Sequence, residues 1–418
     1  MKRPWQITLG DYAPLIGEEA AERIAQKAYR LRGLSIVHVS STFYGGGVAE
    51  MLSSLTLLER SLGLRSDWRL IQGSPDFFSV TKKLHNALQG AEINVTDLKQ
   101  AIYEEINLQN ALRMELDGDL VVIHDPQPLP LVQHVRRHCP WIWRCHIDLS
   151  QPHAEAWEVV QPLVEQYDAV VLSLPEYAKE LTVPQVFIMP GIDPFTTKNR
   201  ALSDAEIDDR LRHYEIPEDL PLVVQVSRFD PWKDPEGVIE AFERAAREVP
   251  ATLVLLGNVA MDDPEGQQVF ESIIGRKSER VRILTAEDSA FVNALQRRAD
   301  VVLQKSLREG FGLTVTEAMW KSAVVIGGDC GGIRRQIENE KSGFLVSSVE
   351  DAAKRIVEVL EDSDLRATMG EAAHARVVEH FLLSRLLEDH LDLFMAFEQG
   401  YALKSSRLPA RVRLGSYE

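Results

Sequence analysis

The sequence predicts an α/β protein built from two doubly wound, Rossmann-like domains, each with a parallel sheet. Short apolar runs rich in Val, Ile and Leu alternate with longer amphipathic segments along the chain. The runs show no strict alternation of apolar and polar residues, which is typical of strands buried on both faces of a parallel sheet. This strand–helix rhythm occurs twice with a break between, and such a pattern indicates a doubly wound fold.

The apolar runs give the expected strands. Those of the first half are residues 34–39, 120–123, 141–145, 169–174 and 186–189. Those of the second half are residues 222–226, 252–256, 281–284, 301–304, 324–326 and 344–346. Between them, residues 238–247 and 291–298 have the apolar spacing of amphipathic helices. We also expect a helix at residues 18–31 and a purely helical segment at residues 351–399.

The break between the two halves lies at residues 189–194, Met-Pro-Gly-Ile-Asp-Pro. Two prolines and a glycine disfavour both a helix and a central strand. A polar stretch follows up to Asp209, so the whole region is expected to link two domains.

The composition limits the classes to which the protein can belong. The chain has 418 residues, with 46 Lys and Arg against 63 Asp and Glu, and a formal net charge of −17. A broad nucleic-acid interface needs an excess of basic residues. No apolar stretch approaches the roughly 18 residues of a membrane span, so neither nucleic acid nor a membrane is an expected partner. Three cysteines without a Cys-x-x-Cys pair exclude a zinc knuckle and favour a reducing compartment, so we expect a cytoplasmic protein.

A glycine triplet follows the first expected strand. In open α/β sheets, ligands bind at the carboxyl ends of the strands. Gly45, Gly46 and Gly47 would let backbone N–H groups approach an anion, and the next helix N-terminus favours negative charge. The turn is a candidate phosphate cradle, with a flexible turn as the alternative. The dinucleotide motif Gly-x-Gly-x-x-Gly is absent. Asp67 does lie about 20 residues further on, where such proteins have an acid that binds the ribose, but this one match supports an NAD oxidoreductase only weakly.

Histidine and carboxylate side chains follow two further strands of the first half, in His124-Asp125-Pro126-Gln127 and His146-Ile147-Asp148. Imidazole, amide and carboxylate groups can hydrogen-bond to a neutral polyol. The alternative for the carboxylates is helix N-capping, and for the histidines a structural role. Two such segments at one sheet edge favour a binding site, whose candidates are His146, Asp125, Gln127 and Asp148.

Two cations follow the first strand of the second half, in Ser227-Arg228-Phe229-Asp230-Pro231-Trp232-Lys233. Arg228 and Lys233 at a carboxyl strand end could neutralise a diphosphate. Most Lys and Arg side chains are instead solvated surface charges, which is the alternative.

Two glutamates flank a glycine-rich turn later in the chain, Glu309-Gly310-Phe311-Gly312-Leu313-Thr314-Val315-Thr316-Glu317. The turn can offer backbone N–H groups to a phosphate, while the two carboxylates can hold sugar hydroxyls. The alternative is that both glutamates lie on a charged helix face, but the Gly-Phe-Gly segment between them would interrupt such a helix.

Taken in order, these segments resemble retaining glycosyltransferases of family 4 and, within them, the trehalose glycosyltransferring synthase subgroup. The resemblance rests on the glycine turn, the His146 segment, Arg228 with Lys233, and Glu309 with Glu317. It implies the glycosyltransferase B fold, in which two Rossmann-like domains face a cleft.

The resemblance also implies the domain boundaries, because the family's final helix returns to the first domain. Residues 1–193 plus 383–418 would form the acceptor-side domain, and residues 194–382 the domain that binds the donor nucleotide-sugar. The subgroup makes trehalose from a nucleoside diphosphate glucose (ADP- or UDP-glucose) and free glucose. Nucleotide-glucose, glucose and trehalose are therefore the expected small-molecule ligands.

The resemblance assigns a role to each candidate residue. The catalytic residues would be His146, Arg228, Lys233 and Glu309. The donor-binding residues would be Gly46, Gly47, Arg228, Lys233, Gly312, Leu313, Thr314 and Glu317. The acceptor-binding residues would be Asp125, Gln127 and Asp148. The family often has glycine after the lysine where this chain has Asp234, which puts the geometry of that loop in question.

We expect neither a cofactor nor a metal ion. Metal-dependent glycosyltransferases often use an Asp-x-Asp pair, and Asp117-Gly118-Asp119 matches it literally. This pair precedes an expected strand, away from the ligand edge, and is predicted to be a turn. Asp262-Asp263-Pro264 fits a helix start with proline in the first turn. Arg228 and Lys233 would supply the positive charge instead.

The sequence leaves several alternatives open. A trehalose phosphorylase that uses glucose 1-phosphate would share this scaffold, and a non-catalytic sugar-nucleotide sensor is a third possibility. The base of the donor, the direction of the reaction and the oligomeric state, including a homodimer, are not decided.

We expect free glucose rather than glucose 6-phosphate as acceptor, because Asp125 and Asp148 would repel a phosphate. Lys82, Lys83 and Arg144 are the basic residues that would argue otherwise.

Overall fold

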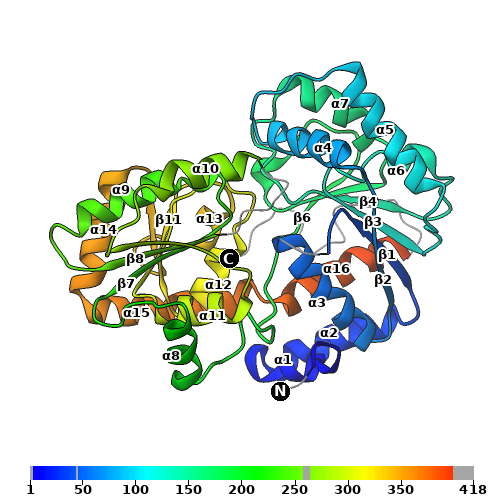
Figure 1. Ribbon diagram of the computed structural model, residues 1–418. Helices are drawn as coiled ribbons and strands as arrows, with labels where there is room; N and C mark the ends of the chain where they lie inside the picture. The colour runs from blue at the N-terminus through cyan, green and yellow to red at the C-terminus, as the bar shows by residue number, and fades with distance from the viewer. Residues whose placement is uncertain (1–2, 44–45, 258–263, 399–418) are drawn as a thin grey trace. The chain divides into compact units, whose positions relative to one another are not determined.

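The computed structural model describes residues 3–43, 46–257 and 264–398. The chain folds into two compact units, a first unit of Met1–Gly191 with Leu383–Glu418 and a second unit of Ile192–Leu382. Each unit contains a parallel six-stranded sheet with helices on both faces (Figure 1). The predicted doubly wound α/β fold class is confirmed.

The first sheet has the strand order β2-β1-β3-β4-β5-β6. Its strands are β1 Ser35–Ser40, β2 Arg65–Leu70, β3 Leu120–His124, β4 Trp141–Arg144, β5 Ala169–Leu172 and β6 Gln185–Phe187. The chain runs from β1 outward to β2 and then returns to the other side of β1 to form β3. The loops after β1 and β3 therefore leave the sheet at its topological switch point, where ligands bind in such sheets.

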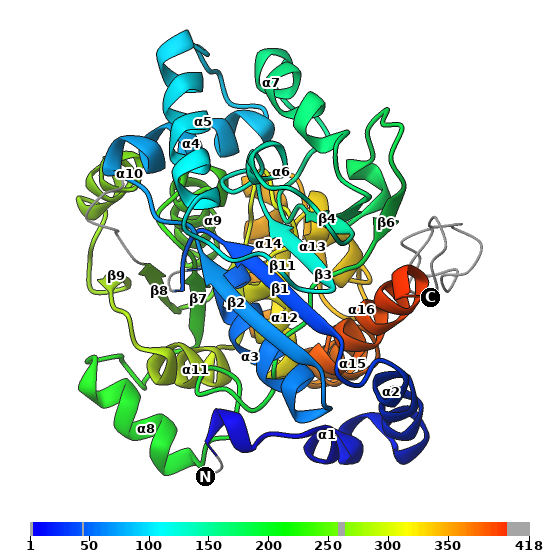
Figure 2. The ribbon, with the colours of Figure 1, turned by 90° about the vertical axis from the view of Figure 1, so that its right-hand side faces the viewer.

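Two groups of helices cover the first sheet. One face carries α2, α3 and α16, and the other carries α4, α5 and α7 (Figure 1). The C-terminal α16 runs alongside α2 (Figure 2), and its Glu388 accepts hydrogen bonds from Arg23 at 2.7 Å and Lys27 at 2.8 Å. The helical elements of this unit are η1 Pro4–Gln6, α1 Leu9–Ile16, α2 Glu18–Arg30, α3 Gly47–Ser61, α4 Pro75–Leu88, α5 Asp97–Ala111, α6 Leu131–His134, α7 Ala154–Val164, η2 Pro175–Tyr177 and α16 Leu383–Glu398.

The second sheet has the strand order β12-β11-β10-β7-β8-β9, so its switch point lies between β7 and β10. Its strands are β7 Leu222–Val226, β8 Thr252–Gly257, β9 Val281–Thr285, β10 Val301–Gln304, β11 Val324–Gly328 and β12 Phe344–Val346. The core on one face packs Val223, Leu253 and Val301 of the strands against Phe242 of α9 and Ile356 of α14. The helical elements are α8 Asp204–His213, η3 Pro231–Lys233, α9 Pro235–Ala245, α10 Pro264–Ile274, α11 Ser289–Arg298, α12 Leu313–Trp320, α13 Gly331–Gln336, α14 Val349–Glu361 and α15 Ser363–His380.

One strand, β2, was not expected from the sequence. It contains three charged residues and lacks the apolar run by which the other strands were identified. As an edge strand it pairs only with β1, so one of its sides stays open to water. Its Asp67 forms ion pairs with Arg69 at 2.9 Å and Arg60 at 3.5 Å. Asp67 thus lies inside the strand, away from the carboxyl end where a ribose-binding acid is needed.

The polar stretch up to Asp209 is not a linker, contrary to expectation. It belongs to the second unit, where Asn199 is buried. The Asn199 carbonyl accepts a hydrogen bond from Nε1 of Trp320 at 2.9 Å, and its Oδ1 accepts one from Nζ of Lys321 at 3.0 Å. Polar groups pack here because Trp320 of α12 and Lys321, which follows it, supply their donors.

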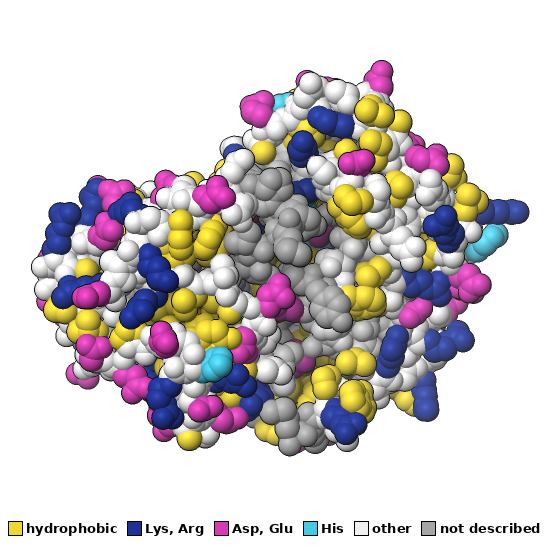
Figure 3. Space-filling model, viewed as in Figure 1, with side chains coloured by type: hydrophobic (Ala, Val, Ile, Leu, Met, Phe, Trp, Pro, Cys, Tyr) yellow, Lys and Arg dark blue, Asp and Glu magenta, His cyan; other side chains and the backbone are white. Residues whose placement is uncertain are grey.

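The surface and the cysteines agree with the composition. On the described part of the face in Figure 3, Lys and Arg are interspersed with Asp and Glu, without a continuous basic patch. Within residues 3–43, 46–257 and 264–398, no helix is long and apolar enough to cross a membrane. Cys139, Cys145 and Cys330 are free thiols.

The glycine that ends β11 gives a test of the second sheet. A Cβ on Gly328 would lie 2.1 Å from the carbonyl oxygen of Ser306, so Gly328→Ala must displace backbone next to the switch point. We expect a loss of about 3 kcal/mol of unfolding free energy and a Tm lower by at least about 5 °C. The control is Gly275→Ala, where a Cβ meets nothing within 4 Å. Equal Tm values for the two variants in thermal unfolding would contradict the packing.

Candidate functional site

The glycine turn after β1 leads directly into α3. Gly46 is the N-cap of this helix and Gly47 is its first residue, while Gly45 lies outside the described residues. A Cβ on Gly46 would meet no described atom within 4 Å, so packing does not require glycine there. The first N–H groups of α3 carry the partial positive charge of a helix N-terminus. This arrangement fits a cradle for an anion.

Asp125 directly follows β3 and has φ +63°, a left-handed conformation that is uncommon for residues with a side chain. Its Oδ1 accepts a hydrogen bond from the backbone N–H of His146 at 2.8 Å, and its own N–H donates to the Arg144 carbonyl at 2.9 Å. The ends of β3 and β4 are thus tied together through Asp125. Burial raises the pKa of Asp125 to about 6, against the lowering effects of the His146 N–H and Arg144.

The ring of His146 stacks on that of His124, with centroids 5.3 Å apart and planes 12° apart. Nε2 of His146 lies 3.0 Å from Nδ1 of His124. Burial, followed by the charges of Arg144 and His390, lowers the pKa of His146 well below its usual range. The ring of His146 is therefore neutral near pH 7.

Gln127 lies two residues beyond Asp125 in the same loop. Its backbone carbonyl accepts a hydrogen bond from Nδ2 of Asn107 at 3.1 Å, which fixes its position. Its Oε1 is buried and has no hydrogen-bond partner among the described residues. A buried amide oxygen of this kind would gain free energy from a ligand hydroxyl.

Asp148 is buried, and its Oδ1 accepts a hydrogen bond from the N–H of Ser150 at 2.8 Å. It therefore has a local role in the loop after β4, and its role in ligand binding stays a prediction. Lys179, which the sequence reasoning missed, donates from Nζ to the Ser150 carbonyl at 3.1 Å. Burial lowers the pKa of Lys179, and the Asp148 carboxylate opposes that effect. Lys179 is thus a cation beside a predicted acceptor residue.

The basic residues that would argue for a phosphate on the acceptor are Arg144, Lys82 and Lys83. Arg144 ends β4 and is buried, and its Nη2 donates to the Ile188 carbonyl at 2.6 Å. Lys82 and Lys83 lie on α4, where Lys83 is exposed and Lys82 is half-buried.

In the second unit, the loops after β7 and β10 meet at the switch point. Nζ of Lys233, at the end of η3, forms an ion pair with Oε2 of Glu309. The two side chains are only 18% and 12% exposed. The N–H of Leu307 also donates to the Trp232 carbonyl at 2.8 Å. The structure therefore brings together Lys233 and Glu309, two residues that the sequence predicted for one site.

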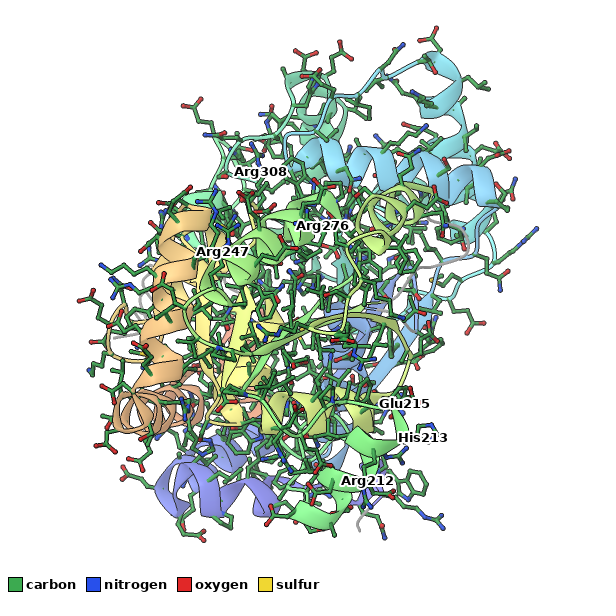
Figure 4. All side chains as sticks on the ribbon, turned by 60° about the vertical axis from the view of Figure 1, so that its left-hand side comes forward. Arg212, His213, Glu215, Arg247, Arg276 and Arg308 are labelled. Atoms are coloured by element: carbon green, nitrogen blue, oxygen red, sulfur yellow. The ribbon has the colours of Figure 1, made fainter. Side chains whose placement is uncertain are left out.

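Arg228 lies in the same loop but is more open to solvent. Its side chain is 57% exposed, and its Nη2 lies 3.4 Å from Oδ2 of Asp230. Arg308 (labelled in Figure 4) adds a further cation, whose guanidinium carbon lies 5.2 Å from the centroid of the Trp232 ring. The sheet edge thus carries several cations near one ion pair, a suitable environment for phosphates.

Asp234 resolves the question raised by the missing glycine. It has φ 49° and ψ 53°, which is the left-handed conformation that glycine adopts without strain. Its side chain accepts a hydrogen bond from the N–H of Gly237 at 3.1 Å and forms an ion pair with Lys305. The loop therefore keeps a glycine-like backbone, held by these contacts. Lys305, buried directly after β10, was not identified from the sequence.

The glycine-rich turn ends at the N-terminus of α12. Gly312 is the N-cap with φ +86°, and a Cβ there would lie 3.0 Å from Cγ of Glu309, so glycine is needed at this position. Leu313 and Thr314 form the first turn, whose N–H groups are suited to an anion. Glu317 is buried, and its Oε1 pairs with Nζ of Lys198 at 3.0 Å. No local pattern marks Lys198, which precedes α8 and lies far from any motif in the sequence.

The Asp-x-Asp segment lies at the amino end of β3, as predicted, and bends at Gly118 and Asp119. Oδ2 of Asp119 accepts a hydrogen bond from the N–H of Ser35 at 2.8 Å, while Asp117 is largely exposed. Across the described residues, no group of three or more His, Cys, Asp or Glu side chains could hold a metal ion. Asp262 and Asp263 lie outside the residues that the structure describes, and α10 begins at Pro264.

Two family models match the chain, one in each unit. "Trehalose synthase, N-terminal domain" matches residues 38–179, and "Glycosyl transferases group 1" matches residues 206–376. The trehalose synthase of Thermococcus litoralis is 45% identical over 399 residues, which cover 93% of this chain and 97% of that protein. This chain belongs to the trehalose synthase family. The trehalose synthase of Rubrobacter xylanophilus is 39% identical over 405 residues, covering 94% and 97%.

More distant matches are consistent with this membership. The trehalose phosphorylase of Grifola frondosa is 26% identical over 426 residues, and the match covers 88% of this chain but 58% of that protein. Among solved structures, the sucrose-phosphate synthase of Thermosynechococcus elongatus has a TM-score of 0.70 at 17% identity, covering 88% of this chain and all of that one. The predicted glycosyltransferase B fold and the predicted family are confirmed.

The ion pair at the second switch point gives a mutational test. Lys233→Ala and Glu309→Gln each remove one charge from a loop, so we expect glycosyl transfer to fall about 100-fold or more while Tm changes little. The control is Lys341→Ala, which removes an exposed lysine paired with Glu338 at 3.0 Å in the same unit. Steady-state kinetics and thermal unfolding of the three variants provide the measurement. Near-normal kcat/KM in Lys233→Ala or Glu309→Gln would remove that residue from the site.

The raised pKa of Asp125 gives a pH dependence. Its carboxyl is protonated well below about pH 6 and ionised above it. If the carboxylate accepts hydrogen bonds from a sugar, kcat/KM for the acceptor should fall about tenfold per pH unit below pH 6. The profile is measured with the wild type and Asp125→Asn, which should have a lower plateau and no acid limb of this origin. If kcat/KM falls in the same way below pH 6 in Asp125→Asn, the fall is caused by another group.

Proposed function

We propose that this member of the trehalose synthase family transfers glucose, with retention, from a nucleoside diphosphate glucose to free glucose and so makes trehalose. The observation that carries the proposal is the Lys233–Glu309 ion pair. It places a cation that can bind a diphosphate in contact with a carboxylate that can bind sugar hydroxyls. The diphosphate and the sugar are neighbouring parts of the donor.

Donor binding would use the second unit. Arg228 and Lys233 would bind the diphosphate and stabilise the charge that develops on it as the bond to the glucose carbon breaks. Lys233 would exchange the Glu309 carboxylate for phosphate oxygens, which leaves Glu309 able to accept hydrogen bonds from glucose. The N–H groups of Gly312, Leu313 and Thr314 would face the phosphates, and Glu317 would hold the ribose.

Acceptor binding would use the first unit. Asp125, Gln127 and Asp148 would accept hydrogen bonds from glucose hydroxyls, and His146 would contact a sugar near the reacting carbon. Gly46 and Gly47 would approach the diphosphate with backbone N–H groups. The acceptor oxygen forms the new bond to the glucose carbon on the face from which phosphate leaves. The leaving phosphate oxygen takes the acceptor proton, so no protein nucleophile, metal ion or cofactor is required.

Two rival functions are tested by the same experiment. A phosphorylase would use glucose 1-phosphate, whose single phosphate Arg228 and Lys233 could also bind, and a sensor would bind a nucleotide-sugar without turnover. The wild type is incubated with ADP-glucose, UDP-glucose or glucose 1-phosphate together with glucose, with and without EDTA, and products are identified by NMR. We expect trehalose from at least one nucleotide-glucose, unaffected by EDTA. Trehalose only from glucose 1-phosphate, or no turnover, would refute the proposal.

The choice of acceptor gives a further prediction. Glucose and glucose 6-phosphate compete at equal concentration for the preferred donor, and we expect trehalose to predominate over trehalose 6-phosphate. The carboxylates of Asp125 and Asp148 would repel a phosphate in this partly buried environment. Lys179 is a cation near Asp148 that could attract the phosphate of glucose 6-phosphate. The variant Lys179→Met is therefore measured in parallel and should keep the preference for glucose. Predominant trehalose 6-phosphate in the wild type would contradict the prediction.

A further inference from the structure

A chain of hydrogen-bonded side chains runs from a buried carboxylate to His146, within the first unit. Glu59 on α3 is fully buried, and its Oε2 lies 3.3 Å from Nε2 of His38 on β1. Nδ1 of His38 lies 3.0 Å from Nε2 of His124, at the end of β3. Nδ1 of His124 in turn lies 3.0 Å from Nε2 of His146. The two strands that flank the switch point therefore carry the two middle members of the chain.

The carboxylate gives the chain a direction. A carboxylate only accepts hydrogen bonds, so Nε2–H of His38 donates to Glu59. With His38 neutral, its Nδ1 accepts a hydrogen bond from Nε2–H of His124, and Nδ1 of His124 accepts one from Nε2–H of His146; a protonated His38 would instead donate from Nδ1 and reverse both hydrogen bonds. Each ring is thus the same tautomer, because the hydrogen bond at one nitrogen of a histidine decides which nitrogen carries the proton. His146 is left with an unprotonated Nδ1.

Burial is the main reason why the rings of His124 and His146 are neutral, because it lowers the pKa of both. Nearby charges act in the same direction: those of Arg144 on β4 and His390 on α16 on both rings, and those of His146 and His38 on His124. Asp125 binds the backbone N–H of His146 rather than its ring.

The other end of the chain is also fixed. Ser66 on β2 donates from Oγ to Oε2 of Glu59 at 2.5 Å, which holds the carboxylate in place. Oε1 of Glu59 is buried without a hydrogen-bond partner among the described residues. Such a group costs folding free energy, which packing alone does not justify.

We propose that Glu59 is a positioning residue that acts through His38 and His124 to hold His146 with Nδ1 as a hydrogen-bond acceptor. The identity of the bound group rests on the proposed function. An acceptor nitrogen binds a sugar hydroxyl, which can donate, and does not bind an ionised phosphate oxygen, which cannot. His146 therefore reads a glucose hydroxyl rather than the diphosphate.

The tautomer of His146 is measured directly on the free full-length wild type. Long-range ¹H–¹⁵N NMR of histidine-labelled protein at pH 8 distinguishes the protonated from the unprotonated ring nitrogen, and the His146→Gln variant assigns the signals. We expect Nε2 of His146 to be protonated and Nδ1 to be unprotonated. A proton on Nδ1 in the wild type overturns the proposal, whether or not any variant folds.

Two variants at Glu59 separate positioning from packing. Glu59→Met removes the acceptor at similar volume, so His146 should show mixed tautomers and kcat/KM with the preferred donor should fall about 5- to 10-fold. Glu59→Gln keeps an acceptor oxygen and should restore the wild-type tautomer and most of the activity. Because Glu59→Met leaves the buried Ser66 hydroxyl and Nε2–H of His38 without their acceptor, its Tm should fall, and Glu59→Gln should lose less.

The matched control is Thr56→Val, which alters another buried polar side chain on α3 that does not belong to the chain. It should keep both the tautomer and the activity. An unchanged His146 tautomer in Glu59→Met overturns the proposal. A wild type that makes no trehalose refutes the proposed function, whereas the tautomer result stands independently of it.

Discussion

The chemistry of this protein depends on a constraint of parallel sheets, which bring the carboxyl ends of all strands to one edge. Where the strand order reverses, the connections on either side lead to opposite faces of the sheet and leave room for a ligand. In the first sheet this point lies between β1 and β3, and in the second between β7 and β10. Almost every predicted site residue follows one of these four strands or β4 beside them. Side chains far apart in sequence, such as Lys233 and Glu309, meet for this reason.

In the second unit, the cations at the ligand edge are held by carboxylates. Lys233 pairs with Glu309, Lys305 with Asp234, and Lys198 with Glu317. Such pairs fix long, flexible side chains before a substrate arrives, so part of the entropic cost of ordering them falls on folding rather than on binding. They also keep the positive charges compensated in a chain whose overall charge is negative. An arriving diphosphate would have to compete for these cations, which favours ligands with at least two negative charges.

Much of the fold follows from sequence, because buried parallel strands are uniform apolar runs. The strand β2 was missed because its alternate residues Arg65, Asp67 and Arg69 place charged side chains on one face of the sheet, so that this edge strand has no apolar run. The polar segment around Asn199 carries no local sign of packing, because its partners Trp320 and Lys321 are distant in sequence. Within the site, motif residues were found because glycine turns and acidic pairs are local patterns. Their partners Lys198, Lys305 and Lys179, and the chain from Glu59 through His38, depend on tertiary contacts that no local pattern encodes.

The central claim is that the donor binds at the switch point of the second sheet, with its diphosphate on the cations that flank Glu309. The most direct measurement is a crystal structure with a non-transferable nucleoside diphosphate glucose analogue. The account predicts that Nζ of Lys233 leaves Glu309 for diphosphate oxygens, while the Glu309 carboxylate accepts hydrogen bonds from the glucose. A diphosphate bound elsewhere, with the Lys233–Glu309 pair intact, would contradict it.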